Sequence, residues 1–117
     1  MVEKRPEGRI DYIEMPVASV AQAKAFYGKL FGWKFVDYGD DYSSFSDGRM
    51  DGGFTAESAV KAGGPLIVLY SANLESMQKA ITDAGGKICK PTFSFPGGRR
   101  FHFQDPSGNE LAVWSDT

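Results

Sequence analysis

Few residues in this chain have the chemistry to hold a metal ion or to attack a substrate. The sequence contains one histidine, His102, and one cysteine, Cys89. Protein zinc sites are mostly built from several histidine and cysteine ligands, so neither a two-histidine nor a cysteine-based site is possible. The acid–base chemistry that remains is a carboxylate such as Glu14 acting with His102.

Two similar runs of elements must position these residues. Residues 10–17 alternate as a strand does, and Ser19 then opens a helix that ends at Gly32. Residues 66–71 form a second strand, and Asn73 opens a second helix roughly half a chain length after the first. Strand-forming segments separated by turn signals follow each helix. The pattern predicts an α+β fold built from two βαβββ modules.

The boundaries of the modules follow from the small residues between them. We expect one domain over residues 1–117, with a first module at about 10–56, a linker at 57–64 and a second module at about 65–115. Paired modules of this kind usually form a site between them. The repeat therefore indicates where a ligand would lie.

Composition narrows the possible partners. The chain has 117 residues, a net charge of −2 and 42% hydrophobic residues, an ordinary globular mix. The acidic balance gives no general attraction to nucleic acid, and no apolar run is long enough to span a membrane. The polar start of the chain lacks the apolar stretch of a secretory signal, so we expect a cytoplasmic protein.

Three stretches resemble the glyoxalase/bleomycin resistance protein/dioxygenase superfamily, also called the vicinal oxygen chelate proteins. They are the first strand running into SVAQAKAFYGKLFGWKF, the helix end AGGKI, and FQDPSGNELAVW near the end of the chain. In detail the sequence is similar to the small group described as predicted enzymes related to lactoylglutathione lyase. The resemblance implies that the sheets of the two modules curl into a half-open β-cup with the helices outside and a ligand inside.

Members of that superfamily that act as enzymes hold one divalent metal in the cup. The resemblance places the four ligand positions at Tyr12, Leu66, Ala112 and either Gly52 or Phe54. Among these side chains only the Tyr12 phenol could coordinate a metal, and one phenol does not hold an ion. We therefore expect no metal and no cofactor, which puts metal-dependent isomerisation, epoxide opening and ring cleavage in doubt.

Alternation assigns the side chains expected to face the ligand. They combine an apolar floor with a few polar groups, as small-molecule pockets do. The candidate ligand-binding residues are Tyr12, Glu14, Phe54, Leu66, Val68, Tyr70, Arg100, His102, Gln104, Glu110 and Trp114, with Ala112 beside them.

Each chemical candidate has a structural alternative. Glu14 could act as a general base with His102 as its proton partner, or it could be satisfied by Tyr12 or Arg100. Arg100 could clamp a carboxylate or phosphate, or be a solvated hairpin end. Tyr70 and Trp114 could stack on a flat ligand, or simply fill a cup that has lost its metal.

These observations lead to three hypotheses about function. The first is a metal-free superfamily protein that binds a small molecule in the cup. The second is a lyase or isomerase with an atypical site, and the third is a non-catalytic interaction module with a vestigial cup. We expect a homodimer, because the edges of two curled sheets need covering, and no nucleic-acid or membrane partner.

Overall fold

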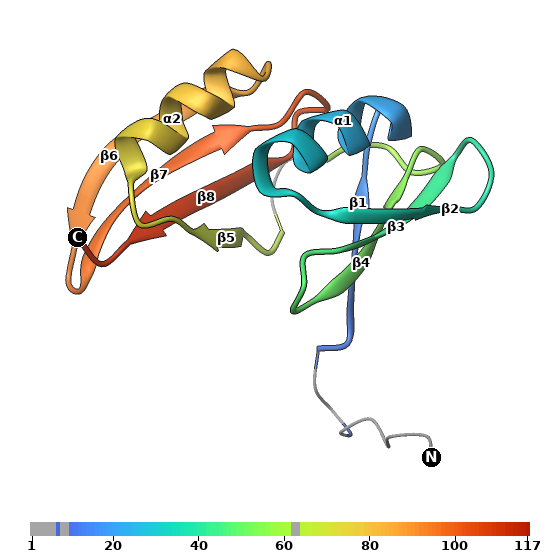
Figure 1. Ribbon diagram of the computed structural model, residues 1–117, viewed down its shortest axis with the longest axis horizontal. Helices are drawn as coiled ribbons and strands as arrows, with labels where there is room; N and C mark the ends of the chain where they lie inside the picture. The colour runs from blue at the N-terminus through green and yellow to red at the C-terminus, as the bar shows by residue number, and fades with distance from the viewer. Residues whose placement is uncertain (1–6, 8–9, 62–63) are drawn as a thin grey trace.

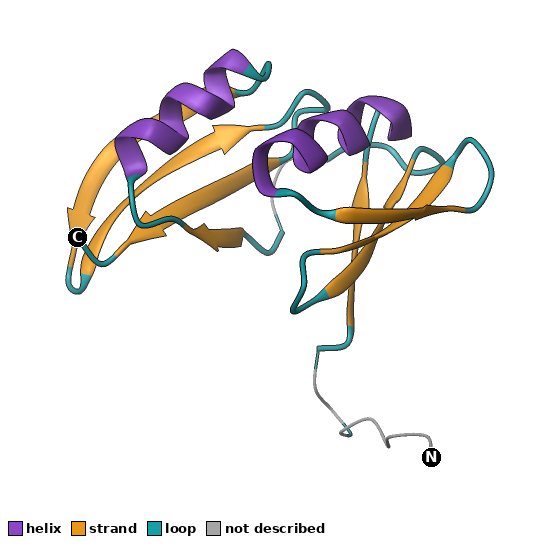
Figure 2. Ribbon diagram, in the orientation of Figure 1, coloured by secondary structure: helices purple, strands orange, loops and turns teal. Residues whose placement is uncertain are grey.

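The computed structural model describes residue 7, residues 10–61 and residues 64–117. The elements of the first module are β1 (Tyr12–Pro16), α1 (Val20–Phe31), β2 (Lys34–Asp37), β3 (Tyr42–Ser46) and β4 (Asp51–Thr55). Those of the second are β5 (Ile67–Tyr70), α2 (Leu74–Asp83), β6 (Lys87–Phe95), β7 (Gly98–Gln104) and β8 (Glu110–Ser115). The predicted α+β fold with two βαβββ modules is confirmed (Figure 2).

Each module forms its own mixed sheet of four strands. The strand orders are β1-β4-β3-β2 and β5-β8-β7-β6, with the first and last strand of each module parallel and the other pairs antiparallel. Figure 1 shows α1 and α2 on the same side of the molecule, with the two sheets beneath them and not closed on each other. We call the side of each sheet that faces away from its helix the open face.

Both helices begin at the residues expected from the sequence. The Ser19 hydroxyl accepts a hydrogen bond from the Gln22 backbone N–H at 3.2 Å, and the Asn73 side chain accepts one from the Ser76 N–H at 3.0 Å. These caps satisfy backbone donors that the first turn leaves unpaired. Gly32 ends α1 in the left-handed region, with φ at 71°.

The core lies between each helix and its sheet. In the first module Tyr27 stacks on Trp33 at 4.6 Å between ring centroids, and Trp33 stacks on Phe45 at 4.7 Å. In the second module, fully buried side chains from α2 and the sheet fill the same place: Leu74, Ile81, Phe101, Phe103, Leu111 and Val113. Because strand side chains alternate, the residues between these core positions point to the open face.

Pro91 lies inside a strand of the second module. The sequence predicts two extended segments interrupted at Pro91, whereas β6 runs continuously through that residue. The pairing of β6 with β7 shifts register between Ile88 and Lys90 and again between Lys90 and Phe93. These irregularities accommodate a proline that cannot donate to the ladder, since β6 is an edge strand.

The turn before β8 ties the two modules together. Asp105 accepts a 2.9 Å hydrogen bond from the buried Tyr27 hydroxyl of α1, and Asn109 Nδ2 donates to the Pro16 carbonyl at 2.7 Å. The Ala18 N–H donates to the Ser107 hydroxyl at 2.9 Å. These bonds cross between segments far apart in sequence, so they fix how the two open faces sit relative to each other.

The molecule measures 42 × 31 × 26 Å along its principal axes. Within the described ranges, neither helix is long and apolar enough to cross a membrane.

Candidate functional site

The open face of the first sheet is built from alternate residues of its strands. Tyr12 and Glu14 of β1 lie beside Asp51 and Gly53 of β4 in the parallel ladder. Met15, on the opposite side of β1, is only 4% exposed and belongs to the core. Tyr12 and Glu14 therefore lie on the face expected from the sequence, away from α1.

A hydrogen-bonded cluster occupies the centre of this face. The Tyr42 hydroxyl donates to Glu14 Oε2 at 2.9 Å, and the hydroxyls of Tyr12 and Tyr42 are 2.6 Å apart. Because the Tyr42 proton is directed at the carboxylate, Tyr12 is the donor in the second bond. Burial, followed by the hydrogen bonds with Tyr12 and Glu14, raises the pKa of Tyr42 well above its usual range. The cluster thus holds a neutral Tyr42 phenol against an acidic side chain.

Gly53 provides the space for this cluster. A Cβ added there would collide with the Tyr42 and Tyr12 hydroxyls. The expected position of the fourth family ligand, at Gly52 or Phe54, is therefore wrong by one residue, because both of these point to the helix side. A Cβ at Gly52 would meet the Phe45 ring, and Phe54 is fully buried in the core. Phe54 is not part of the open face.

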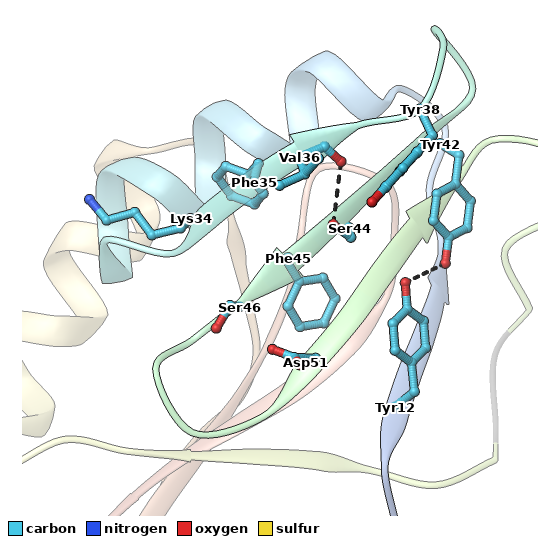
Figure 3. Close-up of a pocket in the computed structure, with 10 residues that line it drawn as sticks. All are labelled: Tyr12, Lys34, Phe35, Val36, Tyr38, Tyr42, Ser44, Phe45, Ser46 and Asp51. Carbon is cyan, nitrogen blue, oxygen red and sulfur yellow. Dashed lines mark hydrogen bonds between the residues drawn. The ribbon is translucent and has the colours of Figure 1, made fainter. Parts of the chain in front are cut away.

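Beside the cluster the first sheet carries a hollow of about 630 Å³. Figure 3 shows Tyr38 and Tyr42 near one end of it, Lys34 at the other, and Ser44 between the strands. The lining is mainly aromatic and apolar, with a few polar groups: Tyr12, Lys34, Phe35, Val36, Tyr38, Tyr42, Ser44, Phe45, Ser46 and Asp51.

Most of the residues that line this hollow were not among the candidates predicted from the sequence. The candidates from the first module were confined to β1 and β4, whereas β2 and β3 supply most of the hollow. A usable signal was present in β3, where Ser44 and Ser46 alternate with the core residue Phe45. The same alternation in β2 places Val36 on the open face, where it is 56% exposed.

The open face of the second sheet carries two cross-strand rows. One row aligns Val68, Ala112, His102 and Lys90 across β5, β8, β7 and β6. The next aligns Tyr70, Trp114, Arg100 and Phe93 in the same order. Gln104 and Glu110 pair beyond the first row. The structure thus brings together on one face the candidates that the sequence placed on β5, β7 and β8.

His102 and Glu14 have different partners. His102 Nδ1 lies 2.8 Å from Glu110 Oε2 on the neighbouring strand, whereas Glu14 accepts from Tyr42 in the other sheet. The expectation that Glu14 and His102 form one acid–base pair is therefore not met by the structure. His102 is 6% exposed, and its Nε2 has no hydrogen-bond partner in the described part of the chain.

Large apolar side chains lie exposed along both open faces. Tyr12, Val36 and Tyr38 are 44%, 56% and 65% exposed on the first sheet. Leu66, before β5, together with Val68 and Tyr70 within it, forms the corresponding exposed row of the second. An apolar surface of this kind usually marks a place where a ligand or another protein binds.

The side chains that the structure describes do not form a metal site. Over the residues that the structure describes, no three histidine, cysteine, aspartate or glutamate side chains lie close enough together to hold an ion. Glu14 and His102 each engage one neighbour, and Gly53 and Ala112 offer no donor atom. The donor set therefore does not fit the divalent metal that the superfamily implies.

Comparisons with known proteins agree with this architecture. The family model for the Glyoxalase/Bleomycin resistance protein/Dioxygenase superfamily matches residues 9–113. A search of curated proteins gives no match. The chain is similar in structure to a glyoxalase/bleomycin resistance protein/dioxygenase family enzyme from Burkholderia phytofirmans PsJN, with a TM-score of 0.81 and 15% identity over 92% of this chain and 100% of that one.

Two further solved structures show the same fold. A glyoxalase-related enzyme from Fulvimarina pelagi has a TM-score of 0.76 and 16% identity over 92% of this chain and 88% of that one. A lactoylglutathione lyase from Agrobacterium tumefaciens has a TM-score of 0.71 and 17% identity over 94% and 95% of the two chains. With the family model covering nearly the whole sequence, the chain belongs to the glyoxalase/bleomycin resistance protein/dioxygenase superfamily.

Proposed function

We propose that this protein is a metal-free member of its superfamily that binds a small molecule at the open faces of its sheets. The observation that carries the proposal is the hollow on the first sheet. Its volume of about 630 Å³ and its lining of tyrosines and apolar side chains with a few polar groups match the make-up of small-molecule sites.

The chemistry of the cluster beside the hollow supports binding without a metal. Tyr12 takes the place of one family ligand, but its hydroxyl already pairs with Tyr42. Burial and hydrogen bonding raise the pKa of Tyr42, so its phenol is a poor source of the anionic oxygen that metals prefer. The same neutral hydroxyls are well suited to hydrogen-bond a ligand.

Two measurements on protein purified from cells test this proposal. The first measurement is elemental analysis, which should find no stoichiometric divalent metal. The second is a search for a ligand by two assays, non-denaturing mass spectrometry and a thermal-shift screen of small molecules, and it should find one. Val36→Glu places a charge in the hollow and should weaken binding of that ligand at least tenfold, whereas Lys79→Ala on α2 should leave it unchanged. About one bound transition metal per chain, or no ligand in either assay, would contradict the proposal.

A second candidate function rests on the bond between Glu14 and Tyr42. A carboxylate that accepts a hydrogen bond from a phenol beside a hollow could act as a general base in a lyase or isomerase reaction. Turnover of the bound molecule in the absence of metal would distinguish this enzyme from a binding protein, and Glu14→Gln would then abolish it.

We further propose that the protein is a homodimer whose copies cover each other's open faces. The exposed apolar side chains on both sheets favour this arrangement. The charges are complementary as well, since the first open face carries Glu14 and Asp51 and the second carries Lys90. Light scattering at tens of micromolar should give the mass of two chains, and Val68→Glu should give the mass of one.

A monomer in that measurement would contradict the dimer. It would also favour the remaining alternative, in which the exposed apolar surface receives a different protein. Lys79→Ala, which changes only an exposed salt bridge on α2, serves as the control and should leave the mass unchanged.

A further inference from the structure

Arg100 is surrounded by aromatic rings on the open face of the second sheet. Its guanidinium carbon lies 5.3 Å from the centre of the Phe93 ring and 5.8 Å from that of Phe95. Trp114 pairs with Arg100 across the ladder and lies 6.4 Å from Phe95, ring to ring. Aromatic faces stabilise the cation, and the same rings keep water away from one side of it.

Among the described residues, the Arg100 guanidinium has no polar partner. In the part of the chain that the structure describes, Arg100 makes no hydrogen bond or ion pair, and its Nε is buried without an acceptor. The neighbouring Arg99 differs, because its Nη1 pairs with Glu75 at 3.0 Å and its Nε donates to the Thr117 carbonyl. The two adjacent arginines thus provide an unpaired and a paired cation in the same strand.

The free end of Arg100 is accessible. The side chain as a whole is half-buried, and only Nε among its nitrogens is both fully covered and unpaired. A ligand can therefore reach the terminal nitrogens while the Phe93 and Phe95 rings lie against the guanidinium. Because a half-buried charge without a counterion is unfavourable, an anion at this end would be strongly bound.

A second unsatisfied atom lies on the same face. His102, two residues further along β7, keeps its ring fixed by Glu110 and leaves Nε2 without a partner. Two acidic groups contact side chains of this face: Glu110, beside His102, and Asp116, which accepts from the Tyr70 hydroxyl at 2.9 Å. Two flanking carboxylates disfavour a doubly charged phosphate more than they disfavour a monoanion.

We propose that the open face of the second sheet binds a small aromatic carboxylate, with its carboxylate on the Arg100 guanidinium and its ring against Trp114 and Tyr70. This inference goes beyond the proposed function, because it adds a ligand site on the second sheet to the hollow on the first. The planar guanidinium matches a carboxylate in bidentate geometry, and the row Tyr70, Trp114, Arg100 and Phe93 provides flat apolar surface beside it.

Calorimetric titration with three probes tests the assignment. Phenylacetate carries both the ring and the charge, phenylacetamide only the ring, and acetate only the charge. Phenylacetate should bind at least tenfold more tightly than either of the others, since a charge-assisted pair and ring burial both contribute. Arg100→Gln should lower phenylacetate affinity to that of phenylacetamide.

Matched variants make the result specific. Arg99→Gln removes the adjacent arginine, which pairs with α2, and should change phenylacetate affinity by less than about twofold. Arg100→Lys keeps the charge but loses the bidentate geometry, so its affinity should fall between wild type and Arg100→Gln. It also tests the inference if Arg100→Gln fails to fold.

Several outcomes would overturn the inference. These are no binding of phenylacetate at millimolar concentration, equal affinity for phenylacetamide, or equal losses in the Arg99 and Arg100 variants. Dissociation of a dimer by Arg100→Gln with unchanged phenylacetate affinity would assign Arg100 to a carboxylate of a second copy instead. A ligand from the thermal-shift screen that depends on Val36 but not on Arg100 would preserve the proposed function while this inference fails.

Discussion

The hydroxyls of Tyr12 and Tyr42 meet at 2.6 Å directly above Gly53. The two tyrosines come from β1 and β3, the neighbours of β4 on either side, so their rings can meet only if the residue between them lacks a side chain. The absent side chain of Gly53 thus leaves the space that the tyrosine pair occupies. The Glu14 carboxylate completes the cluster by accepting from Tyr42.

Gly53→Ala should break this pair. The new methyl group would occupy the space of both hydroxyls, and we expect a loss of about 1–3 kcal/mol in the free energy of unfolding. Urea unfolding measures the loss. Ser44→Ala, on the same face beside Gly53, removes a half-buried hydroxyl and its 3.3 Å hydrogen bond to the Val36 carbonyl, and should cost less than about 1 kcal/mol. Equal stability of Gly53→Ala and wild type would show that the cluster does not lie over this glycine.

Glu14→Gln distinguishes the possible roles of the acidic group. If Glu14 is a catalytic base, turnover should fall about 10²–10⁴-fold while ligand affinity is kept. If it orients a ligand, affinity should fall by roughly 1–3 kcal/mol, and if it only anchors Tyr42 the melting temperature should drop instead. We expect the second or third result, because Glu14 is exposed and already has a phenol partner. Asp51→Asn, on the same face, is the control, and equal effects of both changes would show a general charge effect.

Strand alternation was sufficient to predict the open face where strands are short and regular. Tyr12 and Glu14 lie on the open face of the first sheet, and Val68, Tyr70 and Trp114 lie on that of the second, because each strand has a single register relative to its helix.

Alternation could not predict which residues of β4 face the open side of the sheet. Gly52 and Gly53 are adjacent glycines, so the segment has no alternating pattern to show which one faces the ligand. Phe54 carries the only strong apolar signal there, and it belongs to the core rather than the open face. The parallel pairing with β1 decides the register, and a pairing between distant segments is not visible in either one alone.

The hydrogen-bond partners of Glu14 and His102 could not be predicted from the sequence either. The bond between Glu14 and Tyr42 depends on β3 lying next to β4, and that between His102 and Glu110 depends on the register of β7 and β8. Composition identifies His102 as the only histidine, but its partner depends on tertiary placement.

Asp105→Ala should weaken the junction between the two modules. Asp105 is buried and accepts hydrogen bonds from the Tyr27 hydroxyl and from the Ser107 and Asn109 N–H groups, each at 2.9 Å. Leaving these donors unpaired should lower the free energy of unfolding by about 3 kcal/mol or more. Asp105→Asn keeps one acceptor oxygen and should lose less in the same urea titration. Indistinguishable losses would mean that packing, rather than these bonds, holds the junction.

Tyr27 should make the protein sensitive to alkaline pH. Burial, followed by the charge and hydrogen bond of Asp105, raises the pKa of Tyr27 well above its ordinary value of 10. Above about pH 10 the unfolded chain releases this proton while the folded chain keeps it. The stabilisation is therefore complete below pH 10 and declines as pH rises towards the folded pKa, by up to about 1.4 kcal/mol per pH unit.

Urea unfolding of wild type and Tyr27→Phe at intervals from pH 8 to 11 measures this contribution. At pH 8 the variant should be less stable than wild type, because it lacks the hydrogen bond to Asp105. Above pH 10 its stability should fall less steeply, because phenylalanine cannot ionise. Tyr70→Phe is the control, because the pKa of Tyr70 is also raised, chiefly by its hydrogen bond with Asp116, but its side chain is 54% exposed. That variant should keep nearly the wild-type slope. Parallel curves for wild type and Tyr27→Phe would show that other groups, such as the lysines, account for the alkaline loss.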